Sequence, residues 1–304
     1  MWFKNLQIYR FPAPWNTTVA QLEEALARHL FRSCTSYELQ TQGWASPREN
    51  GALVHAVNGH WLLALGTEKK LLPASVIKEL VKVRAVDMEQ RQGFKPGRKQ
   101  LRELKDQTTD ELLPRAFNVR RNTLVWIDPV HGRLVIDAGS PGRADEVVAH
   151  FNKAITDISL ERLNVAMSPG AAMTSWLAAN ETPHGFSIDQ DTELQSPADE
   201  KATVRFVRHA LDPKEVQRHI ANGKQCTRLA LTWANRVSFV LTESFTLKKI
   251  SLVDIIKEGL DSGASILDED EQLDADFAMM TGELKQLLED LVEALGGVQT
   301  VGGR

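Results

Sequence analysis

Residues 53–65, LVHAVNGHWLLAL, contain two apolar runs that flank Asn58-Gly59. Asn-Gly readily adopts the positive φ angles of a type I′ turn, whose twist matches that of two antiparallel strands. This stretch therefore predicts a β-hairpin. Residues 124–136, LVWIDPVHGRLVI, predict a second hairpin in the same way, with its turn at the His-Gly step. Together the two hairpins favour antiparallel sheets.

Helical patterns lie on both sides of the first hairpin. Before it, alternating residues predict a strand at 5–11, and apolar spacing predicts an amphipathic helix at about 18–31. After it, residues 74–113 are expected to form a helical hairpin. Gly93 should end its first helix, and Pro114 should stop its second, because the residue before a proline is disfavoured in the helical region.

The last third of the chain has a similar order of expected elements. A strand at 203–209 leads to a helix that opens at Asp212-Pro213, a hairpin at 226–242 and a helix near residue 255. Strand, helix, hairpin and helix follow one another in the first third as well. The sequence thus suggests an internal β-α-β-β-α repeat, with coincidence as the alternative.

The final expected helix, at 274–295, carries apolar residues that step by four and three, as on one face of a helix. Packing of this face on its own domain is one interpretation. A homodimer contact is the other, and it would use Phe277, Leu284 and Leu291.

These elements predict an α+β fold of antiparallel sheets with flanking helices and a protruding helical hairpin. A connection is expected where Ser, Pro, Ala and Asp are frequent. The expected segments are a first α+β module at 1–73, the helical hairpin at 74–122, a hairpin-helix-strand segment at 123–170, the connection at 171–202, a second α+β module at 203–262 and an acidic helix and tail at 263–304.

The composition is that of a globular protein, with 42% hydrophobic and 25% charged residues among 304. The N-terminus lacks the apolar core of a signal peptide, and no apolar run approaches the ~18 residues that a membrane span needs. Cys34 and Cys226 lie far apart, which favours two buried thiols in a reducing compartment. We therefore expect a cytoplasmic protein that uses no membrane.

The net charge of −4 hides a separation of charge along the chain. Residues 78–121 contain twelve Lys and Arg against seven Asp and Glu, whereas residues 254–293 contain thirteen acids against two bases. Such a separation favours a polyanion as partner of the basic part. Solvated helix surface is the alternative, because several bases have acids at helical spacing.

The candidate DNA-binding residues combine this basic segment with Lys70 and with the corresponding positions of the second module. Without a zinc-finger or helix-turn-helix pattern, we expect contacts to the phosphate backbone, independent of base sequence. The candidates are Lys70, Lys78, Lys82, Lys95, Arg98, Lys99, Arg115, Arg120, Arg121, Arg205, Arg208, Lys248 and Lys249.

Motifs of common catalytic sites are absent from the sequence. It contains no phosphate-binding glycine loop, no C-x-x-C, no pair of histidines four apart and no G-x-S-x-G. The acidic run 268–276 resembles a Mg²⁺ site, but acids at the start of a helix also complement its dipole. We expect no catalytic residue, metal or cofactor. A metal-dependent nuclease that uses 268–276 and a protein-interaction module are the alternatives.

Several segments together resemble the RdgC family of recombination-associated proteins. The resemblance runs from one end of the chain to the other, in matching order and spacing. Its segments are 1–6 (MWFKNL) with Tyr9-Arg10, 112–117 (LLPRAF), 126–128 (WID) with Gly132 and Asp137, 274–277 (DADF) with 280–284 (MTGEL), and 295–297 (LGG).

The resemblance implies a bacterial, nucleoid-associated α+β protein without catalysis. It implies a homodimer closed into a ring whose positively charged hole holds DNA with little sequence preference. Double-stranded DNA is the expected partner, and single-stranded DNA is a further candidate. Such a protein would restrain RecA-promoted strand exchange. Phe117 would lie at one subunit contact, and the acidic C-terminal part would lie outside and assist another contact.

Overall fold

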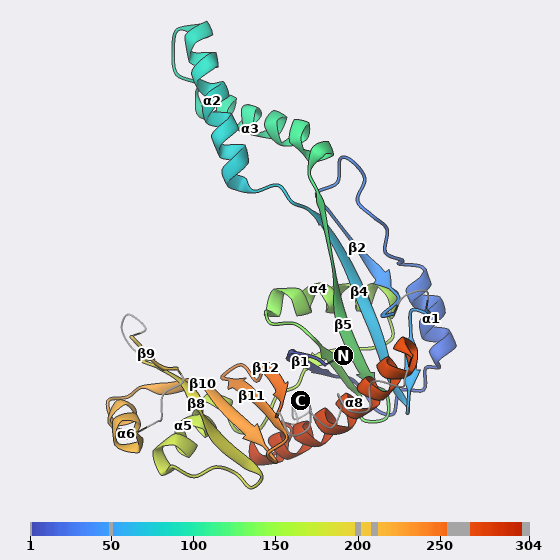
Figure 1. Ribbon diagram of the computed structural model, residues 1–304, viewed down its shortest axis with the longest axis vertical. Coiled ribbons are helices and arrows are strands. Elements are labelled where there is room, and N and C mark those ends of the chain that lie inside the picture. Colours follow the sequence, from blue (N-terminus) through green and yellow to red (C-terminus); the bar gives the residue numbers. More distant parts are fainter. Residues whose placement is uncertain (1, 49–50, 198–201, 208–211, 254–267, 300–304) are drawn as a thin grey trace. The chain divides into compact units, whose positions relative to one another are not determined.

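The computed structural model describes residues 2–48, 51–197, 202–207, 212–253 and 268–299 (Figure 1). In these residues the protein is α+β, with antiparallel ladders joining its strands. The chain divides into two compact units. Unit 1 comprises residues 1–19, 55–62 and 124–304, and unit 2 comprises residues 20–54 and 63–123.

Unit 1 contains most of the sheet. Its strands follow one another by hydrogen bonding in the order β6, β1, β12, β11, β10, β8 and β9, and β7 pairs with β1. The elements are β1 (Asn5–Arg10), β3 (His55–Val57), β6 (Arg133–Ile136), α4 (Pro141–Ala154), β7 (Glu161–Arg162), α5 (Pro169–Ala179), β8 (Phe186–Gln195), β9 (Thr203–Phe206), α6 (Pro213–Ala221), β10 (Gln225–Trp233), β11 (Val237–Thr242), β12 (Leu247–Leu252) and α8 (Glu269–Ala294).

Unit 2 is built around two strands that continue into unit 1, β4 (His60–Lys70) and β5 (Asn118–Asp128). Strand β2 pairs with β4 from Gln40–Lys69 to Ala45–Ala64. A helical hairpin joins the end of β4 to the start of β5. The further elements are α1 (Val19–Ala27), β2 (Gln40–Ala45), α2 (Ala74–Gln92), α3 (Arg98–Leu112) and a 3₁₀ turn (Leu113–Arg115).

The turns follow the local signals in the sequence. Asn58 and Gly59 have φ angles of 50° and 80° between β3 and β4, as a type I′ turn requires. Gly93 ends α2 in the left-handed region with φ 80°, and its N–H donates to the carbonyl of Glu89. Helix α3 ends at Leu112, and Pro114 lies in the 3₁₀ turn that follows it. The β-hairpin predicted at 53–65 and the helical hairpin predicted at 74–113 are thus confirmed.

Strand β1 is paired on both sides. Asn5 and Leu6 pair with β12, and residues 7–10 pair with β6. Its start is held by Asp137, whose carboxylate accepts hydrogen bonds from the N–H groups of Lys4 (3.2 Å) and Asn5 (2.9 Å). Burial raises the pKa of Asp137, against the lowering effect of these hydrogen bonds. The N-terminal strand therefore joins the 124–136 hairpin to the C-terminal strands.

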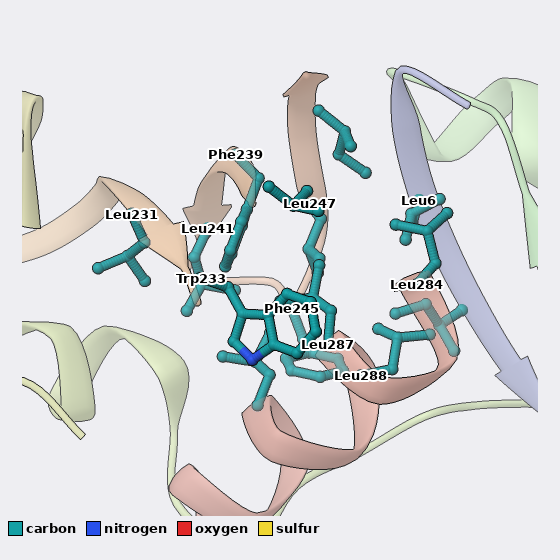
Figure 2. Packing of buried hydrophobic residues seen from close by; sticks show 14 of the residues in the cluster. Leu6, Leu231, Trp233, Phe239, Leu241, Phe245, Leu247, Leu284, Leu287 and Leu288 are labelled. Atoms are coloured by element: carbon teal, nitrogen blue, oxygen red, sulfur yellow. The ribbon is translucent and has the colours of Figure 1, made fainter. Parts of the chain in front are cut away.

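Helix α8 covers the core of unit 1. Figure 2 shows Leu284, Leu287 and Leu288 of α8 facing side chains of the strands, among them Trp233 and Leu247. Polar contacts add to this packing, since Trp233 Nε1 donates to Asp290 Oδ2 at 2.8 Å. The helix is thus held along its length by side chains of its own unit.

This packing corrects one expectation about the interface. Phe277, Leu284 and Leu291 are 1%, 0% and 0% exposed within one chain. Side chains that are buried in their own core are not accessible to a second subunit. They pack on their own domain, which is the other interpretation of the apolar face.

The segment expected as a connection, 171–202, is also corrected. It contains most of α5 and the whole of β8, which pairs with both β10 and β9. The strand was missed because its sequence, FSIDQDTELQ, is polar and several of its side chains are only partly buried. Strand β12 was missed for a different reason, because Lys248 and Lys249 interrupt its apolar alternation.

Other expected boundaries shift in the structure. Helix α1 ends at Ala27, before the expected residue 31, and the strand expected at the end of the 123–170 segment is reduced to Glu161–Arg162. The two units also cut across the six expected segments. The helix expected near residue 255 falls outside the described residues, so the internal repeat stays a prediction.

Both cysteines are free thiols. Cys226 is fully buried, as expected, and burial raises its pKa to about 12. Cys34 is only partly buried, beside Glu68. In the described part of the chain, no helix combines the length and apolar character that crossing a membrane requires.

Replacing Leu284 by Ala should lower the free energy of unfolding by about 3 kcal/mol, because the side chain is fully buried and its loss leaves a cavity. Denaturant unfolding of the purified protein measures the change. Val130→Ala is the control, since Val130 is 64% exposed and should change stability by less than about 0.5 kcal/mol. Equal effects of the two substitutions would contradict the packing described for α8.

Candidate nucleic-acid interface

The helical hairpin carries the densest group of exposed bases. Lys78 and Lys82 lie four residues apart on α2 and so share one stripe of the helix. Lys95 lies in the turn between the helices, and Arg98 and Lys99 open α3. All five side chains are exposed. Their ammonium and guanidinium groups are therefore accessible to a polyanion.

A pair of interhelical contacts holds the hairpin together. Arg84 of α2 donates to Glu111 (2.6 Å) and to Thr108 (3.1 Å) of α3. The hydrogen bond from Arg84 lowers the pKa of Glu111. Ile77 and Leu104 are buried in the same hairpin. Arg84 is thus engaged within the protein, unlike the bases of the turn.

Three further exposed bases lie near the start of β5: Arg115 at the end of the preceding 3₁₀ turn, and Arg120 and Arg121 in the strand itself. Because successive side chains of a strand point to opposite faces, Arg120 and Arg121 point in opposite directions. The guanidinium of Arg120 lies 4.2 Å from the centre of the Phe31 ring, a cation–π contact. No sequence pattern indicated this pair, since its members lie far apart along the chain.

Lys70 does not share this exposure. It is only 8% exposed, and its Nζ donates to the carbonyl of Ala116 at 3.4 Å. This contact links the end of β4 to the segment before β5. Lys70 is therefore left out of the candidate interface, and its contact with DNA stays a prediction.

The remaining candidates lie in unit 1. Arg205 donates to Glu193 at 2.7 Å. Burial alone would raise the pKa of Glu193, but hydrogen bonds from Thr227 and Arg205 and the charge of Arg228 bring it below its usual value. Arg205 is therefore paired.

Lys248 and Lys249 of β12 follow a similar pattern. Lys248 is partly buried, and Lys249 is exposed with its Nζ 3.8 Å from Asp191. Arg208 lies outside the described residues. The eight exposed candidates of unit 2 therefore form the candidate interface: Lys78, Lys82, Lys95, Arg98, Lys99, Arg115, Arg120 and Arg121.

Unit 2 also exposes apolar side chains beside these bases. Eleven of the fifteen large apolar side chains recorded as exposed in the described residues belong to it, although it holds less than a third of the chain. Phe117 is the most exposed with Tyr37, at 80%. Apolar surface of this kind is typical of a contact with another protein.

Phe117 belongs to a small group that we call the apolar edge, formed by Leu39, Leu71 and Phe117. Their backbones are neighbours, since Leu71 donates to the carbonyl of Phe117 (2.7 Å) and Lys70 donates to that of Leu39 (2.9 Å). All three side chains are more than half exposed.

The loop that leads to Leu39 is braced by an ion pair. Arg32 donates to Glu38 at 2.7 Å, and the N–H of Thr35 donates to the same carboxylate. The hydrogen bond from Arg32 is the main reason that the pKa of Glu38 falls to about 2. The apolar edge is thus flanked by a loop whose acid stays ionised and bonded at neutral pH.

The acidic run at the start of α8 has structural partners. Asp268 caps the helix by accepting from the N–H of Glu271 at 2.8 Å. Asp274 Oδ1 lies 2.8 Å from Nε2 of the buried His55, and Asp276 accepts from Gln272. Within the described ranges, no group of three or more His, Cys, Asp or Glu side chains is placed to hold a metal ion.

Comparisons with known proteins agree with the resemblance stated above. A family model described as "Putative exonuclease, RdgC" matches residues 1–298. The chain is 58% identical over 297 residues to the recombination-associated protein RdgC of Janthinobacterium sp. (strain Marseille), with 98% of each chain covered. It is also 58% identical to that of Herminiimonas arsenicoxydans, covering 98% of this chain and 99% of the relative. The Bordetella pertussis protein of the same name is 52% identical, with 99% and 100% covered.

Proposed function

This chain belongs to the RdgC family of recombination-associated proteins, and on that premise we propose that it binds duplex DNA without sequence preference and without catalysing a reaction. The observation that carries the proposal is the set of eight exposed Lys and Arg side chains in unit 2. Dispersed cations of this kind neutralise phosphates, and phosphates carry no sequence information. Single-stranded DNA would bind to the same cations more weakly, because its charge density is lower.

We further propose that two copies of the chain close into a ring around the DNA. The support is the apolar edge, together with the large share of exposed apolar side chains in unit 2. Closure through Phe117 would bury apolar surface that is costly to leave in water. A ring holds DNA by topology, so moderate contacts to phosphates suffice.

In this proposal the protein acts on recombination by occupying duplex DNA. A strand-exchange recombinase such as RecA would then find part of the duplex covered. The protein would work in the cytoplasm, at the nucleoid. The alternative of direct binding to the recombinase would use the same exposed apolar side chains, so the two proposals differ in what Phe117 contacts.

Affinity for random-sequence duplex DNA should fall steeply with salt. Lys95→Gln should reduce the slope of log affinity against log salt by about 0.9, the value for one lost phosphate contact. Arg84→Gln also removes one positive charge. Because Glu111 already binds the Arg84 guanidinium, the slope should not change in this variant. Fluorescence anisotropy across a salt series measures both. Salt-insensitive binding, or equal slopes for Lys95→Gln and the unaltered protein, would contradict the role of the hairpin turn.

Phe117→Ala should weaken self-association about 10- to 100-fold, because burying a Phe side chain contributes about 1.5–3 kcal/mol. Thermal stability should stay unchanged, since the side chain is 80% exposed in one chain. Sedimentation measures the dimer constant. Met167→Ala, a substitution at an exposed apolar residue of unit 1, is the control.

The same variants distinguish a ring from a recombinase-binding surface. A ring should stay on closed circular DNA and leave linear DNA by its ends, and Phe117→Ala should abolish the difference. Unchanged self-association in Phe117→Ala, combined with loss of binding to RecA filaments, would favour the interaction module instead.

The description of the family model as an exonuclease supports one competing function. A nuclease would digest end-labelled DNA in Mg²⁺ or Mn²⁺, and Asp274→Asn would slow the digestion if the 268–276 carboxylates held the metal. We expect intact DNA after prolonged incubation, because these carboxylates cap α8 or pair with His55 and Gln272. Digestion by the unaltered protein that Asp274→Asn abolishes would overturn the non-catalytic proposal.

A further inference from the structure

A row of charged side chains crosses three strands of unit 1 at the end of β1. Arg10 pairs directly with Arg133 of β6 on one side and with Glu161 of β7 on the other. Residues that are directly opposite share one face of a sheet, and like charges placed so are destabilising unless something neutralises them. The placement of Arg10 directly opposite Arg133 therefore needs an explanation.

The protein itself neutralises this pair only in part. Arg133 Nη1 lies 3.6 Å from Glu289 Oε1, which is too long for a hydrogen bond, and this buried nitrogen has no hydrogen-bond partner in the described residues. Arg10 forms no ion pair among the described residues, although Glu161 lies opposite it in the ladder. The hydrogen-bonding capacity of the two arginines is thus not used up within the described part of the protein.

Both arginines line a hollow of about 630 Å³, together with His131, the Phe11–Ala13 segment and the acid Glu161. This volume exceeds that of a simple inorganic ion and suits a ligand of nucleotide size. The hollow is lined only by residues of unit 1, so it shares no residue with the candidate interface of unit 2. It is therefore independent of the DNA interface proposed above.

The wall of the hollow is rigid. Gly132 has φ 62°, and a Cβ at this position would lie 2.3 Å from the carbonyl oxygen of Phe11. The N–H of Phe11 donates to Gly132 at 2.9 Å, and the N–H of Trp15 donates to Pro129 at 3.0 Å. The β5–β6 turn and the segment after β1 are thus locked together, and only glycine permits this approach.

His131 is held in place by a buried acid. Its Nδ1 lies 2.8 Å from Oδ2 of Asp128, which is 1% exposed, and its backbone N–H donates to the other oxygen at 3.1 Å. A carboxylate at Nδ1 favours the tautomer with a proton there and fixes the orientation of the imidazole. The imidazole of His131 is therefore positioned by the fold, as the two arginines are by the strands.

We propose that this hollow binds the phosphate group of a nucleotide. Two guanidinium forks match the several acceptor oxygens of a phosphate and bind them through charge-assisted hydrogen bonds. An added dianion would also relieve the repulsion between Arg10 and Arg133. The phosphate belongs either to a free nucleotide or to the end of a nucleic-acid strand, since both present the same chemistry.

Isothermal titration of the full-length protein with deoxyadenosine monophosphate, inorganic phosphate and deoxyadenosine tests the site. The two phosphates should bind saturably and deoxyadenosine should not. Arg10→Gln and Arg133→Gln should each weaken phosphate binding roughly tenfold or more, as expected for the loss of hydrogen bonds to a charged group. Arg143→Gln removes an equal charge from an exposed position on α4 and should bind as the unaltered protein does.

Thermal melting checks that the variants fold, and Arg10→Lys, which keeps the charge but loses the fork, should bind with intermediate affinity. A short oligonucleotide with and without a 5′-phosphate identifies the source of the ligand. A preference for the 5′-phosphate that Arg10→Gln abolishes assigns a strand end, and binding of the mononucleotide alone assigns a free nucleotide. Absence of saturable phosphate binding, or equal losses in Arg10→Gln and Arg143→Gln, would overturn the proposal.

Discussion

The two-sided pairing of β1 is the constraint on which unit 1 depends. A strand of six residues satisfies its backbone on one side with β12 and on the other with β6, which lie more than 100 residues apart in the sequence. Leu6 and Ile8 are buried between them, so unpaired N–H and C=O groups there would be costly. The sheet of unit 1 can therefore be completed only when the N-terminus takes its place.

Charge in this protein has two separate roles. At the start of α8, acids cap the helix and pair with side chains of the same unit, so much of the negative charge contributes to folding. In unit 2, Arg84 serves the helical hairpin in the same way, while the bases of its turn remain exposed. The net charge of −4 averages these groups and says little about either. Whether a Lys or Arg side chain is available to a partner depends on whether a carboxylate already pairs with it.

The local signals in the sequence were reliable where a few residues decide the backbone. Asn58-Gly59 and Gly93 predicted their turns because their φ angles depend on the residues themselves. Strand β8 was missed because its partly exposed position allows polar residues at most places, which hides the alternation. Lys70 was expected at a surface because lysine usually is, yet packing near Ala116 encloses it. In both cases, β8 and Lys70, the prediction failed because the sequence does not show how exposed or enclosed a position is.

Most of the described helices and turns, the separation of charge and membership of the RdgC family could be predicted from the sequence. Three features could not: the packing of α8 on its own core, the position of Arg120 over Phe31 and the pairing of Arg10 with Arg133. The reason is physical. Turn and helix preferences act over a few residues, whereas these contacts join positions far apart along the chain, and only the packing of the whole unit selects such partners.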